Sequence, residues 1–271
     1  MILTNSEITC WQHCQREHYY RYRLRRTGEK ASPALDRGTR IHAWLAAYWS
    51  GESPTLDGLE PVESAAVQGY AARWEQAAEG AQVNVPFSVD IGSVTMVGEL
   101  DAFDGTDIIE HKTTTSDISP GSAYWQERSA CDRQVSIYLA AFPGATVLYD
   151  VIRMSALRQL GFTKTRAAPE PNEAYVARML EDISERPDYY YQRAQIVRLP
   201  EELDALIDDV TEIAEDIGRD GCARSPKSCF SYGRRCDFFE ACWQGRDINT
   251  FPQAEMNHTE QVKKRLDAYR G

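Results

Sequence analysis

Hydrophobic and polar residues follow a helical spacing near the start of the chain and then change to an alternating spacing. The helical pattern predicts helices over residues 5–26, 36–49 and 62–79. From about residue 85 to residue 113, β-branched residues alternate with polar ones, as they do in half-buried strands. This second pattern predicts strands over residues 86–91, 94–103 and 107–113.

The rest of the chain continues to mix the two patterns. A helix predicted over 129–142 leads into the apolar strand "ATVLYDVIR" at 145–153, which is the order of a strand, helix, strand crossover. We also expect helices at 172–186, 201–217 and 253–270, extended chain at 189–199, and irregular structure in the cysteine-rich residues 221–245. These elements predict an α/β fold with a mixed sheet and helical flanks.

One hairpin, "VGELDAFDGTDIIEHKTT" at residues 97–114, carries two acids and a lysine on neighbouring strands. Asp104-Gly105 is typical of a two-residue type I′ loop. Such a loop would place Phe103 opposite Thr106 and would fix the register of the whole hairpin.

In that register Asp101, Glu110 and Lys112 share one face, because Glu110 and Lys112 are two residues apart and Asp101 lies diagonal to Glu110. Converging carboxylates repel each other unless a cation lies between them, and oxygen ligands suit Mg²⁺ or Mn²⁺. A lysine beside such an ion can stabilise charge that develops on a phosphate. The alternative is a solvent-facing ladder of ion pairs, which is common on antiparallel sheets.

The net charge of the chain limits how it can bind nucleic acid. A net charge of −11 excludes nonspecific coating of DNA, because phosphate binding depends on Lys and Arg. Residues 201–216 are strongly acidic, whereas residues 14–30 interleave arginines with tyrosines. The second segment predicts either a local path for a strand, with base stacking, or an amphipathic helix with a solvated basic face.

Composition also sets the expected compartment. The 271 residues are 42% hydrophobic, but no apolar run approaches the roughly 20 residues that cross a bilayer, and the first residues lack a secretory pattern. We therefore expect a soluble, cytoplasmic protein without a membrane partner. An odd number of cysteines, seven, then favours metal binding, reactive thiols or buried packing over disulfides.

Three motifs in order resemble one known family. Asp101 followed by Glu110-x-Lys112 resembles the core of the PD-(D/E)xK nuclease superfamily. Gln134 and Tyr138, in "DRQVSIY", resemble the Q-x-x-x-Y element of its RecB-like branch, and "RGTRIHAWL" resembles the G-x-x-H helix of that branch. Each motif is short, but their joint order is specific.

The resemblance implies a fold and a mechanism. The fold would be restriction-endonuclease-like, with a mixed central sheet flanked by helices in one domain over residues 1–271. The reaction would be metal-assisted hydrolysis of a phosphodiester by an activated water. The implied catalytic residues are Asp101, Glu110, Lys112, Gln134 and Tyr138. The implied ligands of Mg²⁺ or Mn²⁺ are His42, Asp101, Glu110 and the backbone carbonyl of His111, whose side chain would point away.

Taken singly, some of these residues have ordinary structural explanations. A lone helical histidine such as His42 is commonly a packed or surface residue, and Gln134 and Tyr138 one turn apart fit surface and core positions. Glu99 lies on the same predicted face as Asp101 and is a candidate to replace or supplement it.

The late cysteines form a second candidate site. Cys229, Cys236 and Cys242 are separated by six and five residues, which leaves a tetrahedral site one ligand short. The iron-sulfur members of the same branch supply the fourth thiol from the N-terminal helix, where Cys14 occupies the similar position. The resemblance thus implies a 4Fe-4S cluster held by Cys14 and residues 222–245.

That cluster would close the C-terminal segment onto the N-terminal helix. Cys10 and Cys222 are reserve ligands, and Cys131 is expected to be a packed thiol. The first cysteine spacing is longer than is common in the family, and Asp237 stands where Pro is common, so zinc and free buried thiols are alternatives.

These observations lead to one functional hypothesis and two alternatives. We expect a metal-dependent DNA nuclease, an exonuclease acting on single-stranded DNA or DNA ends, similar to the CRISPR-associated exonucleases and to recombination nucleases. The alternatives are a non-catalytic iron-sulfur subunit for DNA binding or assembly, and a zinc-stabilised endonuclease of the same fold. Residues 246–271, a C-terminal extension, would cover the core or bind a protein partner in a recombination, repair or CRISPR-adaptation complex.

Overall fold

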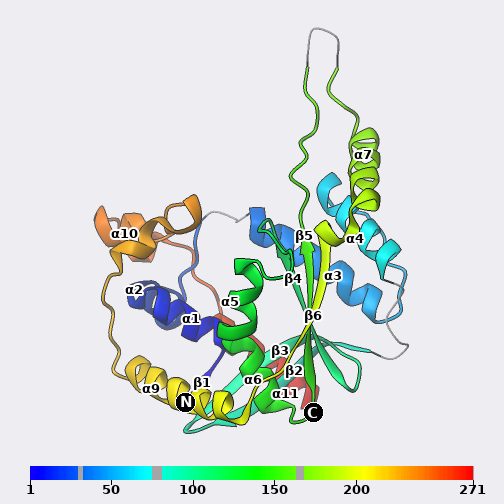
Figure 1. The fold of residues 1–271 in the computed structure, drawn as a ribbon. Helices are drawn as coiled ribbons and strands as arrows, with labels where there is room; N and C mark the ends of the chain where they lie inside the picture. The colour runs from blue at the N-terminus through cyan, green and yellow to red at the C-terminus, as the bar shows by residue number, and fades with distance from the viewer. Residues whose placement is uncertain (30–32, 75–80, 163–167, 271) are drawn as a thin grey trace.

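A mixed six-stranded sheet forms the centre of the computed structural model, which describes residues 1–29, 33–74, 81–162 and 168–270 (Figure 1). Its strands are β1 (Ile2–Leu3), β2 (Gln82–Ile91), β3 (Val94–Phe103), β4 (Asp107–Thr114), β5 (Thr146–Arg153) and β6 (Tyr191–Ile196). The strand order is β1-β3-β4-β5-β6, and β2 also pairs with β3. The β1–β3 and β4–β5 pairs are parallel and the other pairs are antiparallel. The predicted α/β fold with a mixed sheet and helical flanks is therefore confirmed.

Helices cover both faces of the sheet (Figure 1). One core contains the buried faces of α1 (Asn5–His13), α6 (Arg133–Ala141) and α9 (Pro200–Gly218). A second core contains α3 (Pro33–Trp49), α4 (Pro61–Arg73) and α7 (Asn172–Glu185). Adjacent positions of β4 divide between the two sides, since Ile108 belongs to the first core and Ile109 packs with Trp49 of α3.

Short helices and the C-terminal helix complete the chain. They are α2 (Gln15–His18), a π-helical turn (Tyr19–Arg23), α5 (Ala123–Cys131), α8 (Pro187–Tyr190), 3₁₀ turns (Pro226–Gly233 and Ile248–Thr250), α10 (Phe239–Trp243) and α11 (His258–Arg270). No helix in the described ranges is long and apolar enough to cross a membrane.

Two predicted helices are interrupted by residues with extended backbone. The prediction of one helix over 5–26 is wrong, because Cys14 has φ −162° and ψ 112° and separates α1 from α2. The prediction over 129–142 is wrong in the same way, because Asp132 ends α5 and caps α6 by accepting the Gln134 N–H. Elsewhere the boundaries shift by a few residues; part of the predicted helix at 62–79 lies outside the described residues.

The hairpin register differs from the predicted one by two residues. Phe103 pairs with Ile108 rather than Thr106. The connection is longer than a two-residue loop because the Asp104 carboxylate accepts the N–H groups of Thr106 and Asp107, at 2.9 and 2.7 Å. A shift of two residues keeps every side chain on its predicted face, since side chains alternate with a period of two.

An ion pair fixes α3, the helix that carries His42, to α4. Arg40 donates from Nε and Nη2 to the two carboxylate oxygens of Glu63, at 2.9 and 2.6 Å. Glu63 is buried and also accepts the Glu60 N–H at 3.0 Å. Burial would raise the pKa of Glu63, but the hydrogen bond from Arg40 and the Glu60 N–H together lower it.

Glu63→Gln is therefore expected to lower the free energy of unfolding at pH 7. Because the folded pKa of Glu63 lies below its unfolded value, its contribution is present above about pH 4.3 and is lost as pH falls through the folded pKa. The variant should lose less stability than wild type on acidification. Urea unfolding at pH 7 and in mild acid measures this change in stability, with Glu181→Gln, at an exposed position, as the control. An equal change of the free energy of unfolding with pH in the wild type and both variants would contradict the prediction.

Candidate active site

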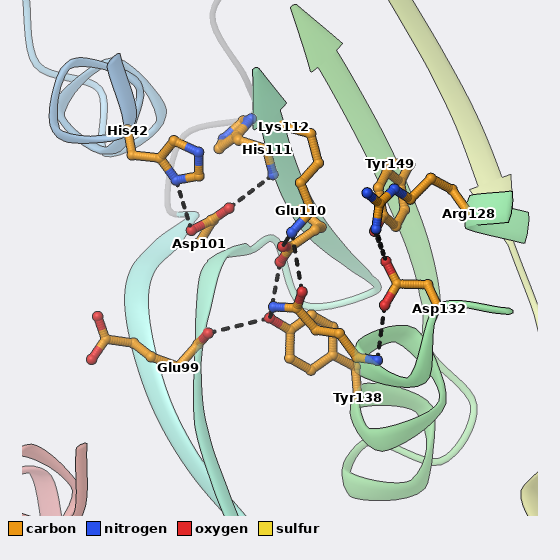
Figure 2. Close-up of polar contacts among 11 residues, drawn as sticks. His42, Glu99, Asp101, Glu110, His111, Lys112, Arg128, Asp132, Tyr138 and Tyr149 are labelled. Carbon is orange, nitrogen blue, oxygen red and sulfur yellow. Dashed lines mark hydrogen bonds and ion pairs between the residues drawn. The ribbon is translucent and has the colours of Figure 1, made fainter. Parts of the chain in front are cut away.

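The predicted site residues come together where β3 and β4 separate, between α3 and α6 (Figure 2). They are His42 from α3, Asp101 from β3, Glu110, His111 and Lys112 from β4, and Gln134 and Tyr138 from α6. The sequence brings them together because the hairpin supplies the acids and the lysine while a helix packs on each side.

Asp101 links α3 to β4. The paired positions of β3 and β4 end at Ala102 and Ile109, and beyond them the Asp101 Oδ2 accepts the backbone N–H of His111 at 2.8 Å. Its Oδ1 lies 3.2 Å from Nδ1 of His42 (Figure 2). Burial opposes ionisation of both side chains, but the contact between them lowers the pKa of Asp101 and raises that of His42.

Glu110, Lys112, Gln134 and Tyr138 form a closed ring of hydrogen bonds between β4 and α6 (Figure 2). Lys112 Nζ donates to a Glu110 oxygen and, at 3.0 Å, to Oε1 of Gln134. Gln134 Nε2 donates to the Tyr138 hydroxyl at 2.5 Å, and that hydroxyl donates to Oε2 of Glu110 at 2.9 Å. The one-turn spacing of Gln134 and Tyr138 thus holds both the acid and the lysine.

Charges interact strongly in this ring because Glu110 is only 3% exposed, so water screens its carboxylate little. Burial raises the pKa of Glu110 and the Asp101 charge adds to that effect, against the opposing influence of Lys112 and Tyr138. Burial alone would lower the pKa of Lys112, but the adjacent Glu110 raises it. Lys112 therefore remains a cation at neutral pH.

Sequence reasoning missed a group of residues that supports α6. The Asp132 carboxylate caps the Gln134 N–H at 2.9 Å and also accepts from the Tyr149 hydroxyl and from Nη1 of Arg128 (Figure 2). Lys112 Nζ lies 5.9 Å from the centre of the Tyr149 ring. An Asp two residues before a functional glutamine is a helix N-cap signal, so this residue was recognisable from the sequence.

The His111 side chain lies on the opposite face, as predicted from strand alternation. Its Nδ1 is 3.3 Å from Oδ2 of Asp150, its register partner on β5. Arg193 of β6 donates to both Asp150 oxygens, each at 3.1 Å, and the Tyr70 hydroxyl also donates to Asp150. Asp150 is fully buried, and a lone acid inside the strand "ATVLYDVIR" was the sequence signal for this network.

Glu99 does not join Asp101 and Glu110. Its side chain extends away from them in Figure 2, and its Oε2 accepts from Nε of Arg265 on α11 at 2.7 Å. Only the backbone carbonyl of Glu99 faces the ring of hydrogen bonds, 3.4 Å from the Tyr138 hydroxyl.

The donor chemistry around Asp101 suits a hard divalent cation, since carboxylates and an imidazole are the groups brought together. In the arrangement described, each carboxylate oxygen of Asp101 and Glu110 has a hydrogen-bond partner within the protein. Within the described ranges, no three His, Cys, Asp or Glu side chains meet the geometry of a formed metal site.

The four predicted cluster cysteines line one small, largely apolar pocket. Cys14 comes from the break between α1 and α2, and Cys229, Cys236 and Cys242 come from the C-terminal segment. All four are free thiols. The reserve candidates Cys10 and Cys222 are not among the residues that line this pocket, and Cys131 is exposed rather than packed as predicted.

Many contacts close the C-terminal segment onto the N-terminal helices. Ser228 Oγ donates to the His13 carbonyl at 2.5 Å, Arg16 Nε donates to the Cys222 carbonyl at 2.7 Å, and Arg21 Nη2 donates to Asp237 at 3.0 Å. The arginine-tyrosine segment predicted either to follow a strand or to form a solvated face therefore also joins the two ends of the chain.

Comparisons with known proteins find one matching protein family and similar solved structures. Residues 3–83 match the PD-(D/E)XK nuclease superfamily, a range that includes His42 and ends before Asp101. A crystal structure of a proposed exonuclease from Eubacterium rectale aligns with a TM-score of 0.50 and 12% identity, over 93% of this chain and 91% of that chain. The structure of SSO0001 aligns with a TM-score of 0.34 and 18% identity, over 77% and 84%. No curated protein matches the sequence. The chain is thus similar to the PD-(D/E)XK nuclease superfamily over residues 3–83, and its overall fold is similar to that of the Eubacterium rectale protein.

Proposed function

We propose that the protein is a metal-dependent DNA nuclease, an exonuclease that acts on single-stranded DNA or DNA ends. The observation that carries the proposal is the hydrogen-bonded ring of Glu110, Lys112, Gln134 and Tyr138 beside Asp101. A solvated ladder of surface charges would not bury Glu110 to 3% exposure or connect it to a second element.

His42, Asp101, Glu110 and the His111 carbonyl would hold Mg²⁺ or Mn²⁺. When bound, the ion supplies Lewis-acid chemistry and neutralises charge on the phosphoryl group. Asp101 is the best placed of these ligands, because His42 and the His111 N–H fix both of its oxygens at the gap between β3 and β4.

Lys112 orients the attacking water and stabilises the charge that develops on the phosphate. Its ammonium is held from two sides, by Glu110 and by Gln134, so its position is set before substrate arrives. Tyr138 orients Glu110, and Asp132 fixes the start of the helix that carries Gln134 and Tyr138.

Purified protein with Mg²⁺ or Mn²⁺ is expected to degrade end-labelled single-stranded DNA, and EDTA should stop the reaction. Asp101→Asn should abolish cleavage while preserving the fold, because the amide keeps the shape of the carboxylate. Stepwise shortening from one end identifies an exonuclease, and internal cuts in a circular strand identify an endonuclease. DNA binding without cleavage under all these conditions would instead support the non-catalytic alternative.

The cysteine pocket supports a second part of the proposal, a 4Fe-4S cluster held by Cys14, Cys229, Cys236 and Cys242. Four thiolate donors with apolar surroundings are the donor set that such clusters use. Zinc, the donor-set alternative, would give a colourless protein without iron. The cluster would be structural, because its ligands come from the two segments that pack together near the ends of the chain.

A further inference from the structure

A pocket of about 210 Å³ lies beside the proposed catalytic residues. Gln134 and Tyr138 form part of one wall, and Arg265 and His258 of α11 form part of another. The volume is many times the roughly 10–15 Å³ that one water molecule needs by this measure, so a phosphate group can enter. The pocket is continuous with the ring of hydrogen bonds, because Gln134 and Tyr138 belong to both.

Helix α11 is built into this position. The Thr259 hydroxyl donates to the buried Glu7 carboxylate at 2.6 Å, which ties the first turn of α11 to α1. Val262 and Leu266 are buried against Val97 of β3. The helix therefore holds Arg265 at a fixed place on the rim of the pocket, which argues against a C-terminal segment that merely covers the core.

Arg265 is the only Arg or Lys among the described residues that line the pocket, and its side chain is half exposed. Its guanidinium contacts Glu99 through Nε, at 2.7 Å. A guanidinium has further N–H groups, so Arg265 can bind a second acceptor or exchange Glu99 for one. A partly exposed ion pair of this kind is weak and is therefore exchangeable.

We propose that this pocket binds a backbone phosphate of the DNA strand next to the scissile phosphate, with Arg265 as its cation and Glu99 as an internal competitor. The inference rests on the proposed nuclease function, because it takes a DNA strand as the ligand. Glu99 is then neither a second Asp101 nor a metal ligand. It holds Arg265 in the free protein and lowers the affinity for nucleic acid that is not properly seated.

The two substitutions should have effects of opposite sign. Arg265→Gln is expected to weaken binding of a labelled single-stranded oligonucleotide by about 10-fold and to reduce the salt slope of the affinity by about 1. Glu99→Gln should strengthen binding by about 3-fold, because it frees the guanidinium. Arg265→Lys should retain most of the affinity, since it retains the charge.

The measurement is fluorescence anisotropy in EDTA, so that binding is read without cleavage. Arg270→Gln is the matched control, because Arg270 lies on the same helix but contacts Ser88 and does not line the pocket. Thermal unfolding of each variant shows whether the fold is kept. The double variant Glu99→Gln, Arg265→Gln should bind the oligonucleotide with the same affinity as Arg265→Gln, because Glu99 has no guanidinium to occupy once Arg265 is replaced.

Weaker binding by both single variants, or an unchanged affinity and salt slope in Arg265→Gln, would overturn the inference. An effect of Glu99→Gln that persists without Arg265 would also overturn it, because Glu99 would then act on binding by a route that does not involve Arg265. Cleavage by the wild-type protein in Mg²⁺ is scored separately. Absence of cleavage by the wild-type protein would therefore contradict the proposed function. Binding that does not depend on Arg265 would contradict only this inference.

Discussion

Lys112→Met is expected to lower the rate of metal-dependent DNA cleavage by at least about 100-fold. The substitution removes the only cation in the ring formed with Glu110, Gln134 and Tyr138. Methionine keeps much of the length and the apolar stem of lysine. The loss should therefore appear in kcat rather than in the affinity for DNA, because the ammonium acts on charge that develops during the reaction.

The same substitution should also destabilise the fold. It leaves the buried Glu110 without its cation, which should lower the free energy of unfolding by about 2 kcal/mol. This value is lower than for a fully buried pair because Lys112 is partly exposed to solvent. The double variant Glu110→Gln, Lys112→Met removes both charges and should regain much of the melting temperature while remaining inactive. Stability and catalysis are thus separated within one pair of residues.

Single-turnover cleavage with excess enzyme, together with thermal unfolding, measures the two effects. Lys227→Met is the control, because Lys227 lies in the C-terminal segment and does not line the pocket beside Gln134 and Tyr138. Recovery of cleavage in the double variant would exclude Lys112 from the chemistry. The expected pattern is inactivity of Lys112→Met and of the double variant, normal cleavage by the wild type and by Lys227→Met, and a melting temperature of the double variant that is closer to the wild-type value than that of Lys112→Met.

Much of this site was predictable because its spacing is local. Glu110 and Lys112 share a strand face by alternation alone, and Gln134 and Tyr138 share a helix face by the length of one turn. The error of two residues in the hairpin register did not matter, since it preserved the faces. These relations depend on secondary structure and need no knowledge of tertiary packing.

Other contacts join residues that no local pattern connects. Glu99 and Arg265 are 166 positions apart, and Asp150 meets Arg193 through the pairing of β5 with β6. The backbone break at Cys14 was also missed, because the residues on each side favour helix. Tertiary packing of the C-terminal segment overrides that preference.

Cys14→Ser is expected to remove most of the bound iron and the visible absorbance of protein purified without oxygen. Cys14 is the one proposed ligand from the N-terminal side, so its loss opens the crosslink to Cys229, Cys236 and Cys242. Loop-closure reasoning for a crosslink of this length gives a loss of about 5 kcal/mol in the free energy of unfolding.

Two further cysteine variants make the assignment specific. Cys131→Ser is the control for thiol loss, because Cys131 is exposed and lies outside the pocket. Cys222→Ser tests the reserve ligand and should retain iron, since Cys222 does not line the pocket either. Loss of iron in Cys222→Ser with retention in Cys14→Ser would reassign the fourth ligand.

Metal content and DNA cleavage should respond to Cys14→Ser in different ways. The proposed cluster would join the two ends of the chain, whereas Asp101 and Lys112 lie where β3 and β4 separate. The fraction of Cys14→Ser protein that stays folded at low temperature should therefore cleave DNA with Mg²⁺. That cleavage should be lost on warming, in parallel with unfolding. Loss of cleavage at a temperature where the variant is fully folded would instead place the cluster in the path of the DNA strand. Wild-type protein that contains zinc and no iron would replace the iron-sulfur assignment altogether.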